Sequence, residues 1–225
     1  MKYLIVSATH LEIQPLLDHL KLKNVMEGIV QKVTIAKNEI SILITGVGMM
    51  TTAFHLGRAL AKNTYDGVIN VGIAGAFDGS LNLGEVVSVN RQQYGDLGVE
   101  STATFEDVFD IGLTKRESHP FKSGKIYNNK TNLNLNPSFK KVRAISVNKV
   151  SGKVDQIAQL ERKYNPQIEV MEGIAVHFAC KQSVVQYEEL RAISNYVEER
   201  NKANWNIPLA VKNVNAFILT FLDRN

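Results

Sequence analysis

The sequence predicts an α/β fold with a single domain over residues 1–225. Strand-like and helix-like runs alternate along the chain, and no linker or internal repeat interrupts them. At 225 residues, 44% of them hydrophobic, the chain can bury a substantial core. One α/β domain is therefore expected rather than two.

The expected elements follow one another from the N-terminus. The apolar run at residues 2–6 predicts a buried strand, and the polar residues after it predict a loop that leads Glu12 into a helix. A helix is expected after Gly173, with Cys180 in its core, and a strand is expected to end at Asn195. Further strands are expected at residues 40–44, 66–71, 84–89 and 142–150, and helices at residues 49–61, 155–163 and 208–222.

Two turns rich in small residues follow the second and third expected strands. Gly46 and Gly48 form a tight turn into a helix, where exposed amides suit a phosphate or a carboxylate. A dinucleotide fingerprint is disfavoured there, because the third glycine and the acidic residue are missing. The second turn is expected at residues 72–77, where the backbone of Ala74 and Gly75 can lie against a flat ring. Residues 94–141 are weakly patterned, which predicts a mobile or partner-covered segment or a plain surface loop.

Composition excludes several classes of function. The formal charge is +4, and 26 basic residues are scattered among 22 acidic ones, which argues against nucleic acid but is compatible with an anionic small substrate. No apolar run approaches membrane-spanning length, and no cleavage site follows the N-terminus, so we expect a cytoplasmic protein without signal peptide or membrane contact. The single cysteine excludes a disulfide within the chain, and the five histidines lack metal-ligand spacing, so we expect no metal and no cofactor.

Three polar residues far apart in the chain indicate a nucleoside pocket. Glu172 at a helix start can accept hydrogen bonds from two sugar hydroxyls, and Asn195 at a strand end can bind two adjacent polar atoms of a purine. Each has a structural alternative, since carboxylates favour the positive end of a helix and Asn favours turns. Glu12 follows the first strand, and ligands collect at the carboxyl ends of strands in α/β sheets. We therefore expect Glu12, Glu172 and Asn195 to converge.

The order and spacing of several motifs give the chain a family resemblance. It resembles the purine nucleoside phosphorylase and nucleosidase superfamily, and within it the hydrolases of methylthioadenosine, S-adenosylhomocysteine or futalosine. The resemblance implies a three-layer sandwich with a central twisted mixed sheet, and a homo-oligomer, commonly a dimer, with a partner loop near the site. It is carried by Glu12 and by residues 45–48, 70–75, 83–87, 150–152, 170–173 and 191–194.

The resemblance also implies roles for residues in breaking an N-glycosidic bond. Glu12 would orient and deprotonate the attacking water, Glu172 would accept hydrogen bonds from the ribose hydroxyls, and Met171 would pack against the sugar. Arg191 would hold Glu172 or Glu12 in place, with a structural ion pair to Glu189 as the alternative. The remaining expected substrate contacts are Gly46, Ala74, Gly75 and Ser194.

The base-reading residue departs from the adenine-specific members, which carry Asp where this chain has Asn195. An Asn amide donates to a 6-oxo group while its carbonyl accepts from a protonated N7, which matches hypoxanthine. Together with water as nucleophile and the continuation at residues 194–198, this resembles the futalosine hydrolases of menaquinone biosynthesis, and the resemblance implies futalosine as the substrate. An adenine nucleosidase and a noncatalytic nucleoside-binding protein stay open as alternatives. Futalosine also carries a benzoate group. Weaker candidates to stack on the base or line the benzoate pocket are Phe77, Phe105 and Phe109, and weaker candidates to bind the benzoate carboxylate are Arg91, Arg200 and Lys202.

Overall fold

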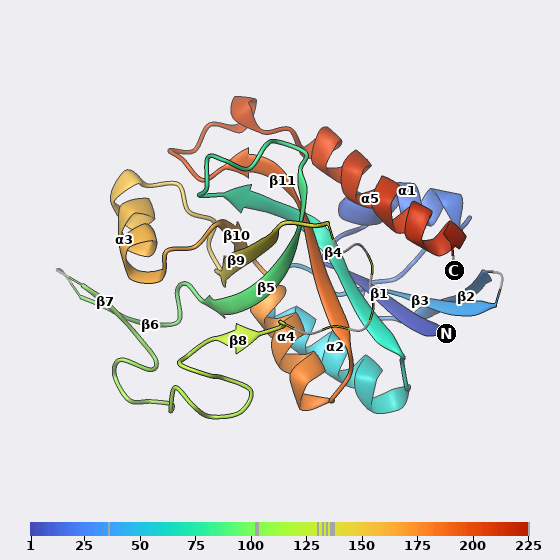
Figure 1. Cartoon of the computed structure of the whole chain (residues 1–225), viewed down its shortest axis with the longest axis horizontal. Coiled ribbons are helices and arrows are strands. Elements are labelled where there is room, and N and C mark those ends of the chain that lie inside the picture. The colour runs from blue at the N-terminus through green and yellow to red at the C-terminus, as the bar shows by residue number, and fades with distance from the viewer. Residues whose placement is uncertain are drawn as a thin grey trace.

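A mixed β-sheet covered by helices on both faces forms the body of the protein, as the computed structural model in Figure 1 shows. The structure describes residues 1–224 except residues 36, 102, 103, 130, 132, 134, 136 and 137. Within those residues the sheet has nine strands. Its strands are β1 (Lys2–Ser7), β2 (Gln31–Ile35), β3 (Asn38–Ile44), β4 (Gly67–Ala76), β5 (Val86–Tyr94), β8 (Ile126–Tyr127), β9 (Lys141–Ser146), β10 (Ile168–Val170) and β11 (Tyr187–Tyr196).

The helices lie on both sides of this sheet, and a small hairpin stands apart from it (Figure 1). Helices α1 and α5 pack together on one face, and α2 and α4 pack together on the other. The helical bounds are α1 (His10–His19), α2 (Met49–Lys62), α3 (Val154–Tyr164), α4 (Gly173–Gln182), the short 3-10 helix η1 (Lys202–Asn204) and α5 (Ile207–Arg224). The separate hairpin pairs β6 (Gly98–Glu100) with β7 (Phe105–Asp107).

The strand order places strands from distant parts of the sequence side by side. The order is β10-β9-β5-β11-β4-β1-β3-β2, and β10 also pairs with β4, so that five strands close into a ring. Strands β1, β4 and β11 are parallel neighbours, whereas β11 is antiparallel to β5. The sheet is therefore mixed, and the predicted three-layer α/β class is confirmed.

Apolar side chains of alternating strand positions fill the two spaces between sheet and helices. Ile5 and Ile69 face α1 and α5, where Ile218 packs on them, whereas Leu4 and Val68 face α2 and α4. This alternation is the period of a strand buried on both faces. Cys180 is fully buried in α4, as predicted.

Some boundaries differ from the sequence predictions. Residues 72–76, expected as a turn, continue strand β4, where Gly72 and Gly75 leave room for side chains of neighbouring elements. The strand expected at residues 142–150 ends at Ser146, and β2 and β10 were not predicted. The segment at residues 94–141, expected to lack regular structure, contains β6, β7 and β8. No helix in the described residues is long and apolar enough to cross a membrane.

Candidate active site

Three of the predicted residues lie around the carboxyl ends of parallel strands. Glu12 follows β1, Asn195 lies near the end of β11, and both strands pair with β4 between them. Glu172 joins this edge from β10, where it stands directly before α4. The carboxyl edge of an α/β sheet is where ligands bind, because loops and helix starts meet there.

The Glu12 carboxylate is held in place by several donors. Thr9 and Glu12 form a reciprocal capping box at the start of α1, in which Glu12 Oε2 accepts from Thr9 N at 3.1 Å. The hydroxyls of Thr9 and Ser7 lie 3.1 and 3.3 Å from the same oxygen, and Ile73 N donates to Oε1 at 3.1 Å. Glu12 is only 7% exposed. Its orientation at the sheet edge is therefore fixed by the protein.

Glu172 is buried as deeply but has fewer donors. It is the residue before α4, and its Oε1 accepts from Gly48 N at 2.8 Å. The amide predicted to suit a carboxylate at the glycine turn thus binds a carboxylate of the chain itself. The pKa of Glu172 is raised to about 7, chiefly by burial. Arg191 and the Gly48 amide oppose this rise, and the nearby charges of Glu12 and Glu189 add to it.

Arg191 is the buried cation between these carboxylates. Its Nε donates to Glu189 Oε1 at 2.9 Å and its Nη2 to Asn70 Oδ1 at 2.5 Å. Burial lowers the pKa of Arg191, but Glu189, Glu172 and Glu12 outweigh burial and raise it. The direct ion pair is with Glu189, the structural alternative considered from the sequence, while Glu12 and Glu172 share the charge of Arg191 at longer range.

Two further polar residues, Gln92 and His177, contact the Glu189 carboxylate. Gln92 Nε2 donates to Glu189 Oε2 at 2.9 Å, and His177 Nε2 lies at ion-pair distance, 2.9 Å, from the same oxygen. Both Glu189 and His177 are fully buried. Burial alone would raise the pKa of Glu189, but Arg191 and His177 outweigh it and lower the pKa to about 2. Glu189 is thus a permanent anion beneath the site.

Two glycines allow these charged groups to approach one another. A Cβ on Gly72 would overlap Arg191 Nη1 and would stand 2.6 Å from Glu12 Oε1. A Cβ on Gly173, the residue after Glu172, would overlap Gln92 and would stand 2.5 Å from Glu189 Oε1. Neither glycine has a left-handed backbone, so the requirement is space rather than conformation.

Ser194 and Asn195 lie in β11, three and four residues beyond Arg191, next to strand β4. A register shift between Ile193 and Asn195 places Asn195 beside Gly75 of β4, where a Cβ would stand 3.2 Å from Asn195 Nδ2. Asn195 Nδ2 donates to Tyr196 O at 2.9 Å, and Ser194 Oγ donates to Asn195 Oδ1 at 2.8 Å or to Ala74 O at 3.1 Å. The Ser194 hydroxyl and the Tyr196 carbonyl therefore fix the orientation of the Asn195 side-chain amide, because one donates to Oδ1 and the other accepts from Nδ2.

The distance between the two groups of residues is set by strand β4. Gly72 adjoins Glu12 and Arg191, and Gly75 adjoins Asn195, three residues along the strand. At about 3.3 Å per residue this separation is about 10 Å. The structure therefore brings Glu12, Glu172 and Arg191 together, and Asn195 lies beside a position of β4 that is about 10 Å further along the strand than Gly72.

Other predicted residues have different surroundings. Met171 is half-buried between β10 and Glu172. Gly46 has a left-handed backbone with φ of 78°, and a Cβ there would overlap the Glu27 carboxylate. Phe77 directly follows β4 and packs against the cluster that contains Ile145 and Leu160.

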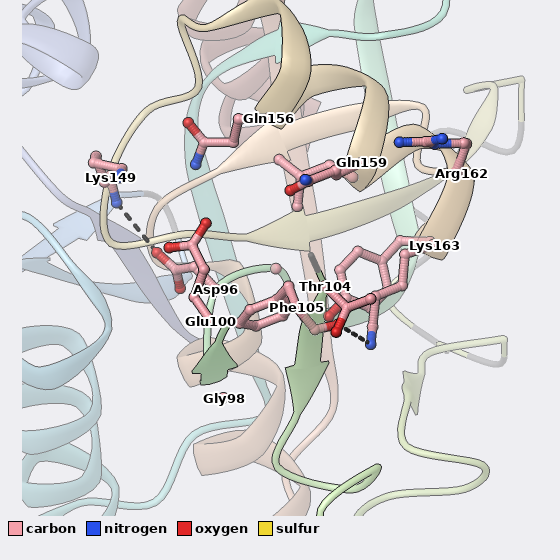
Figure 2. Close-up of a pocket in the computed structure, with 13 residues that line it drawn as sticks. Asp96, Gly98, Glu100, Thr104, Phe105, Lys149, Gln156, Gln159, Arg162 and Lys163 are labelled. Atoms are coloured by element: carbon pink, nitrogen blue, oxygen red, sulfur yellow. Dashed lines mark hydrogen bonds between the residues drawn. The ribbon is translucent and has the colours of Figure 1, made fainter. Parts of the chain in front are cut away.

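A cavity of about 630 Å³ lies between α3 and the β6–β7 hairpin (Figure 2). Phe105, Lys149 and Lys163 line it, and Asp96 accepts from the backbone N–H of Lys149 beside it. None of Glu12, Glu172 and Asn195 lines this cavity. Phe105 is therefore placed with α3 rather than with the predicted base-binding residues.

The remaining weak candidates are engaged elsewhere. Phe109 packs against Phe121, Arg91 donates to Tyr164 O, and Arg200 lies over the Trp205 ring. Lys202 lies in η1. In the described residues no group of three or more His, Cys, Asp and Glu side chains is arranged to hold a metal ion.

Sequence reasoning missed Gln92 and His177 as partners of Glu189, and it missed the requirement for space at Gly72. Glu189 and Arg191 are two residues apart on one strand, so strand periodicity places them on one face. Gln92 and His177 come from β5 and α4, and no local pattern connects them to β11.

Comparison with known proteins identifies the class. Residues 2–223 match the Phosphorylase superfamily, and the chain belongs to that family. Futalosine hydrolases from Thermus thermophilus and Acidothermus cellulolyticus are 30% and 31% identical over 72% and 76% of this chain, and 72% and 70% of their own lengths. A 5'-methylthioadenosine/S-adenosylhomocysteine nucleosidase from Glaesserella parasuis is 23% identical over 99% of both chains.

Solved structures share the fold over the whole chain. Futalosine hydrolase of Helicobacter pylori superposes with a TM-score of 0.84 at 17% identity, covering 100% of this chain and 98% of that one. The methylthioadenosine/S-adenosylhomocysteine nucleosidase of Neisseria meningitidis, in complex with methylthio-immucillin-A, gives a TM-score of 0.81 at 17% identity, covering 100% and 99%. These relatives are N-glycosyl hydrolases, and this chain is an enzyme of that class.

Proposed function

We propose that residues 1–225 act as one domain that hydrolyses futalosine to hypoxanthine and dehypoxanthinylfutalosine, in menaquinone biosynthesis. The observation that carries the proposal is the oriented amide of Asn195 near the end of β11, at the edge of the sheet where the buried Glu12 follows β1. The two futalosine hydrolases are 30% and 31% identical over 72% and 76% of the chain, and a methylthioadenosine/S-adenosylhomocysteine nucleosidase from Staphylococcus haemolyticus is 28% identical over 70% of it.

The amide of Asn195 supplies the hydrogen bonds that a 6-oxopurine needs. Its Nδ2 uses one N–H on Tyr196 O, which leaves the other for a 6-oxo oxygen. Its Oδ1 has a second lone pair beside the one that faces Ser194, and this accepts from a protonated N7. Negative charge grows on the 6-oxo oxygen as hypoxanthine leaves, so the amide bond strengthens in the transition state.

Glu12 favours water over phosphate as the nucleophile. A fixed carboxylate activates water by accepting its proton, whereas it repels a phosphate anion. The Thr9 and Ser7 hydroxyls that face Glu12 Oε2 can rotate, so that oxygen can take the proton of the attacking water. Glu172 accepts hydrogen bonds from the ribose hydroxyls, and Met171 packs against the sugar.

We also propose a homo-oligomer in which a second copy covers helix α2. Met50 and Phe54 are 81% and 62% exposed and lie four residues apart on one face of α2, and Val47, just before the helix, is 54% exposed. Exposed apolar stripes of this kind mark protein interfaces. The stripe adjoins Gly48 and hence Glu172, so the second copy would border the site. Sedimentation analysis of Met50→Glu is expected to give a smaller species than the unmodified protein, and an unchanged size would contradict the proposal.

The second candidate is hydrolysis of methylthioadenosine or S-adenosylhomocysteine. The match over 99% of both chains with a nucleosidase of that name favours it. In that case Asn195 would have to act with an adenine, whose 6-amino group donates rather than accepts. The Nδ2 donor would then face another donor, which costs a hydrogen bond.

The test is product release by the purified protein without phosphate. Hypoxanthine from futalosine and adenine from methylthioadenosine are measured side by side. We expect hypoxanthine release alone, and a preference for adenine release would move the chain to the second candidate. Asn195→Asp is expected to lower hypoxanthine release by about 100-fold, and Glu199→Gln, an exposed change, serves as the control.

A further inference from the structure

Helix α1 is interrupted directly after Glu12. Pro15 lies inside the helix and has no N–H, and Ile13 departs from helical geometry with φ of −124° and ψ of 18°. The helix that carries the proposed base is therefore split into a first turn, which contains Glu12, and a following segment. Such a break is a weak point for a residue that must be held within a fraction of an ångström.

The Asn215 side chain spans this break from helix α5. Its Nδ2 donates to Glu12 O at 2.8 Å, and its Oδ1 accepts from Leu16 N at 3.2 Å. These two backbone groups are four residues apart, so an uninterrupted helix would pair them with each other. The side-chain amide thus binds both backbone groups that the break separates.

Asn215 is itself fixed in orientation. It is 1% exposed, and Nδ2 also donates to Val211 O at 2.7 Å within its own helix. Both amide hydrogens and the amide oxygen are therefore engaged. Neighbouring Val214 and Ile218 lie in the same core as Ile13, which anchors α5 against α1.

We infer that Asn215 is a positioning residue for the proposed water-activating Glu12, holding the backbone of that residue across the break in α1. The side chain of Glu12 is placed by Ser7, Thr9 and Ile73, and its main chain is placed by Asn215. The inference rests on the proposed function, because it assigns Asn215 to the nucleophile half of that reaction.

The kinetic test compares Asn215→Leu with Ile218→Ala on the same helix. Leu has nearly the shape of Asn and removes the three hydrogen bonds, whereas Ile218→Ala destabilises α5 packing without touching Glu12. We expect kcat of Asn215→Leu to fall at least about 10-fold with KM within about 2-fold, since a displaced group loses rate rather than binding. Equal kcat values for the two variants would overturn the inference.

A double variant separates positioning from general damage. If Asn215 acts through Glu12, Asn215→Leu added to Glu12→Gln lowers kcat no further. An equal loss in both backgrounds would contradict the inference. Asn215→Ala replaces Asn215→Leu in both comparisons if the latter does not fold.

An activity-independent measurement keeps this inference distinct from the proposed function. Amide hydrogen exchange of residues 9–17 is expected to be at least about 10-fold faster in Asn215→Leu than in Ile218→Ala, since local opening becomes easier. Equal exchange rates would overturn the positioning role whichever nucleoside is cleaved. Absence of hypoxanthine release by the unmodified protein would contradict the proposed function alone.

Discussion

Glu12 and Glu172 are buried to the same extent, at 7% and 6% exposure, but their surroundings differ. Glu12 lies among the amides of Thr9 and Ile73 and the hydroxyls of Ser7 and Thr9. The hydrogen bond described for Glu172 comes from one backbone amide, that of Gly48. Burial alone therefore does not define the role of a carboxylate. The number of donors that already face it decides whether it is fixed or open to a ligand.

The difference suits the two proposed tasks. A group that activates water must be fixed in direction, and Glu12 is fixed by elements as distant as β4. A group that accepts hydrogen bonds from ribose needs lone pairs that the protein leaves open. Burial raises the pKa of Glu172 to about 7, so bound hydroxyl donors would restore the stabilisation that its charged form lacks.

The largest effect is expected for Glu12→Gln. The amide cannot take a proton from water, so kcat should fall by about 1000-fold while KM changes little. Steady-state hydrolysis of futalosine gives both constants, with Glu39→Gln, at the far end of the parallel strands, as the control. A rise in KM with kcat unchanged would assign Glu12 to binding and remove the contrast with Glu172.

Glu172→Gln should reduce activity less than Glu12→Gln does, and it should act chiefly on KM rather than on kcat. Replacing one carboxylate oxygen by an NH2 group removes a charged acceptor, and we expect kcat/KM to fall by about 100-fold, chiefly through KM. A substrate without the 2'-hydroxyl should lose most of this factor with the unmodified protein and little with the variant. Equal losses with both proteins would show that Glu172 does not bind that hydroxyl.

The sequence was enough to predict β1, β3, β4, β5, β9 and β11, but not β2, β10 or the three short strands within residues 94–141. Glu12, Glu172 and Asn195 each follow a clear local pattern, a strand end or a helix start. Strand β4 was predicted too short, because Gly72 and Gly75 are typical of turns when they are considered alone. Both glycines lie in the strand because side chains of other elements occupy the space of a Cβ.

The partners of the site residues could not be predicted in the same way. His177 and Gln92 meet Glu189 only after α4 and β5 have packed on β11. Asn215 meets Glu12 across 203 residues of sequence, and nothing around Asn215 distinguishes it from an ordinary polar residue of a helix. Local patterns give the position of a residue in its element, whereas the charge balance and the support of the site arise from tertiary packing.

The free energy of unfolding of Glu172→Gln tests how much the charged Glu172 carboxylate, buried with few hydrogen-bond donors, destabilises the folded protein. A pKa raised above the ordinary value of 4.5 means that the folded state prefers the protonated form. That stabilisation is complete below pH 4.5 and is lost as pH rises through about 7. Relative to the unmodified protein, the variant should therefore gain on the order of 2 kcal/mol in free energy of unfolding between pH 5 and pH 8.5.

Urea unfolding at the two pH values measures this gain, and Glu199→Gln provides an exposed carboxylate for comparison. The control should show the same difference from the unmodified protein at both pH values. A gain for Glu172→Gln that does not depend on pH would mean that Glu172 has an ordinary pKa in the folded protein.

The smallest expected effect is the pH dependence of substrate binding by the unmodified protein. The charged form of Glu172 accepts the ribose hydroxyls, and below about pH 7 the free enzyme increasingly holds it protonated. The value of kcat/KM should therefore fall about 10-fold per pH unit below that point, while kcat, which reports the complex, should fall only at lower pH. Glu172→Gln should lack this limb of the profile, and Glu12→Gln should keep it at reduced activity. If Glu12→Gln loses the limb instead, the group that titrates near neutrality is Glu12, and the assignment of a fixed and an open carboxylate must be reversed.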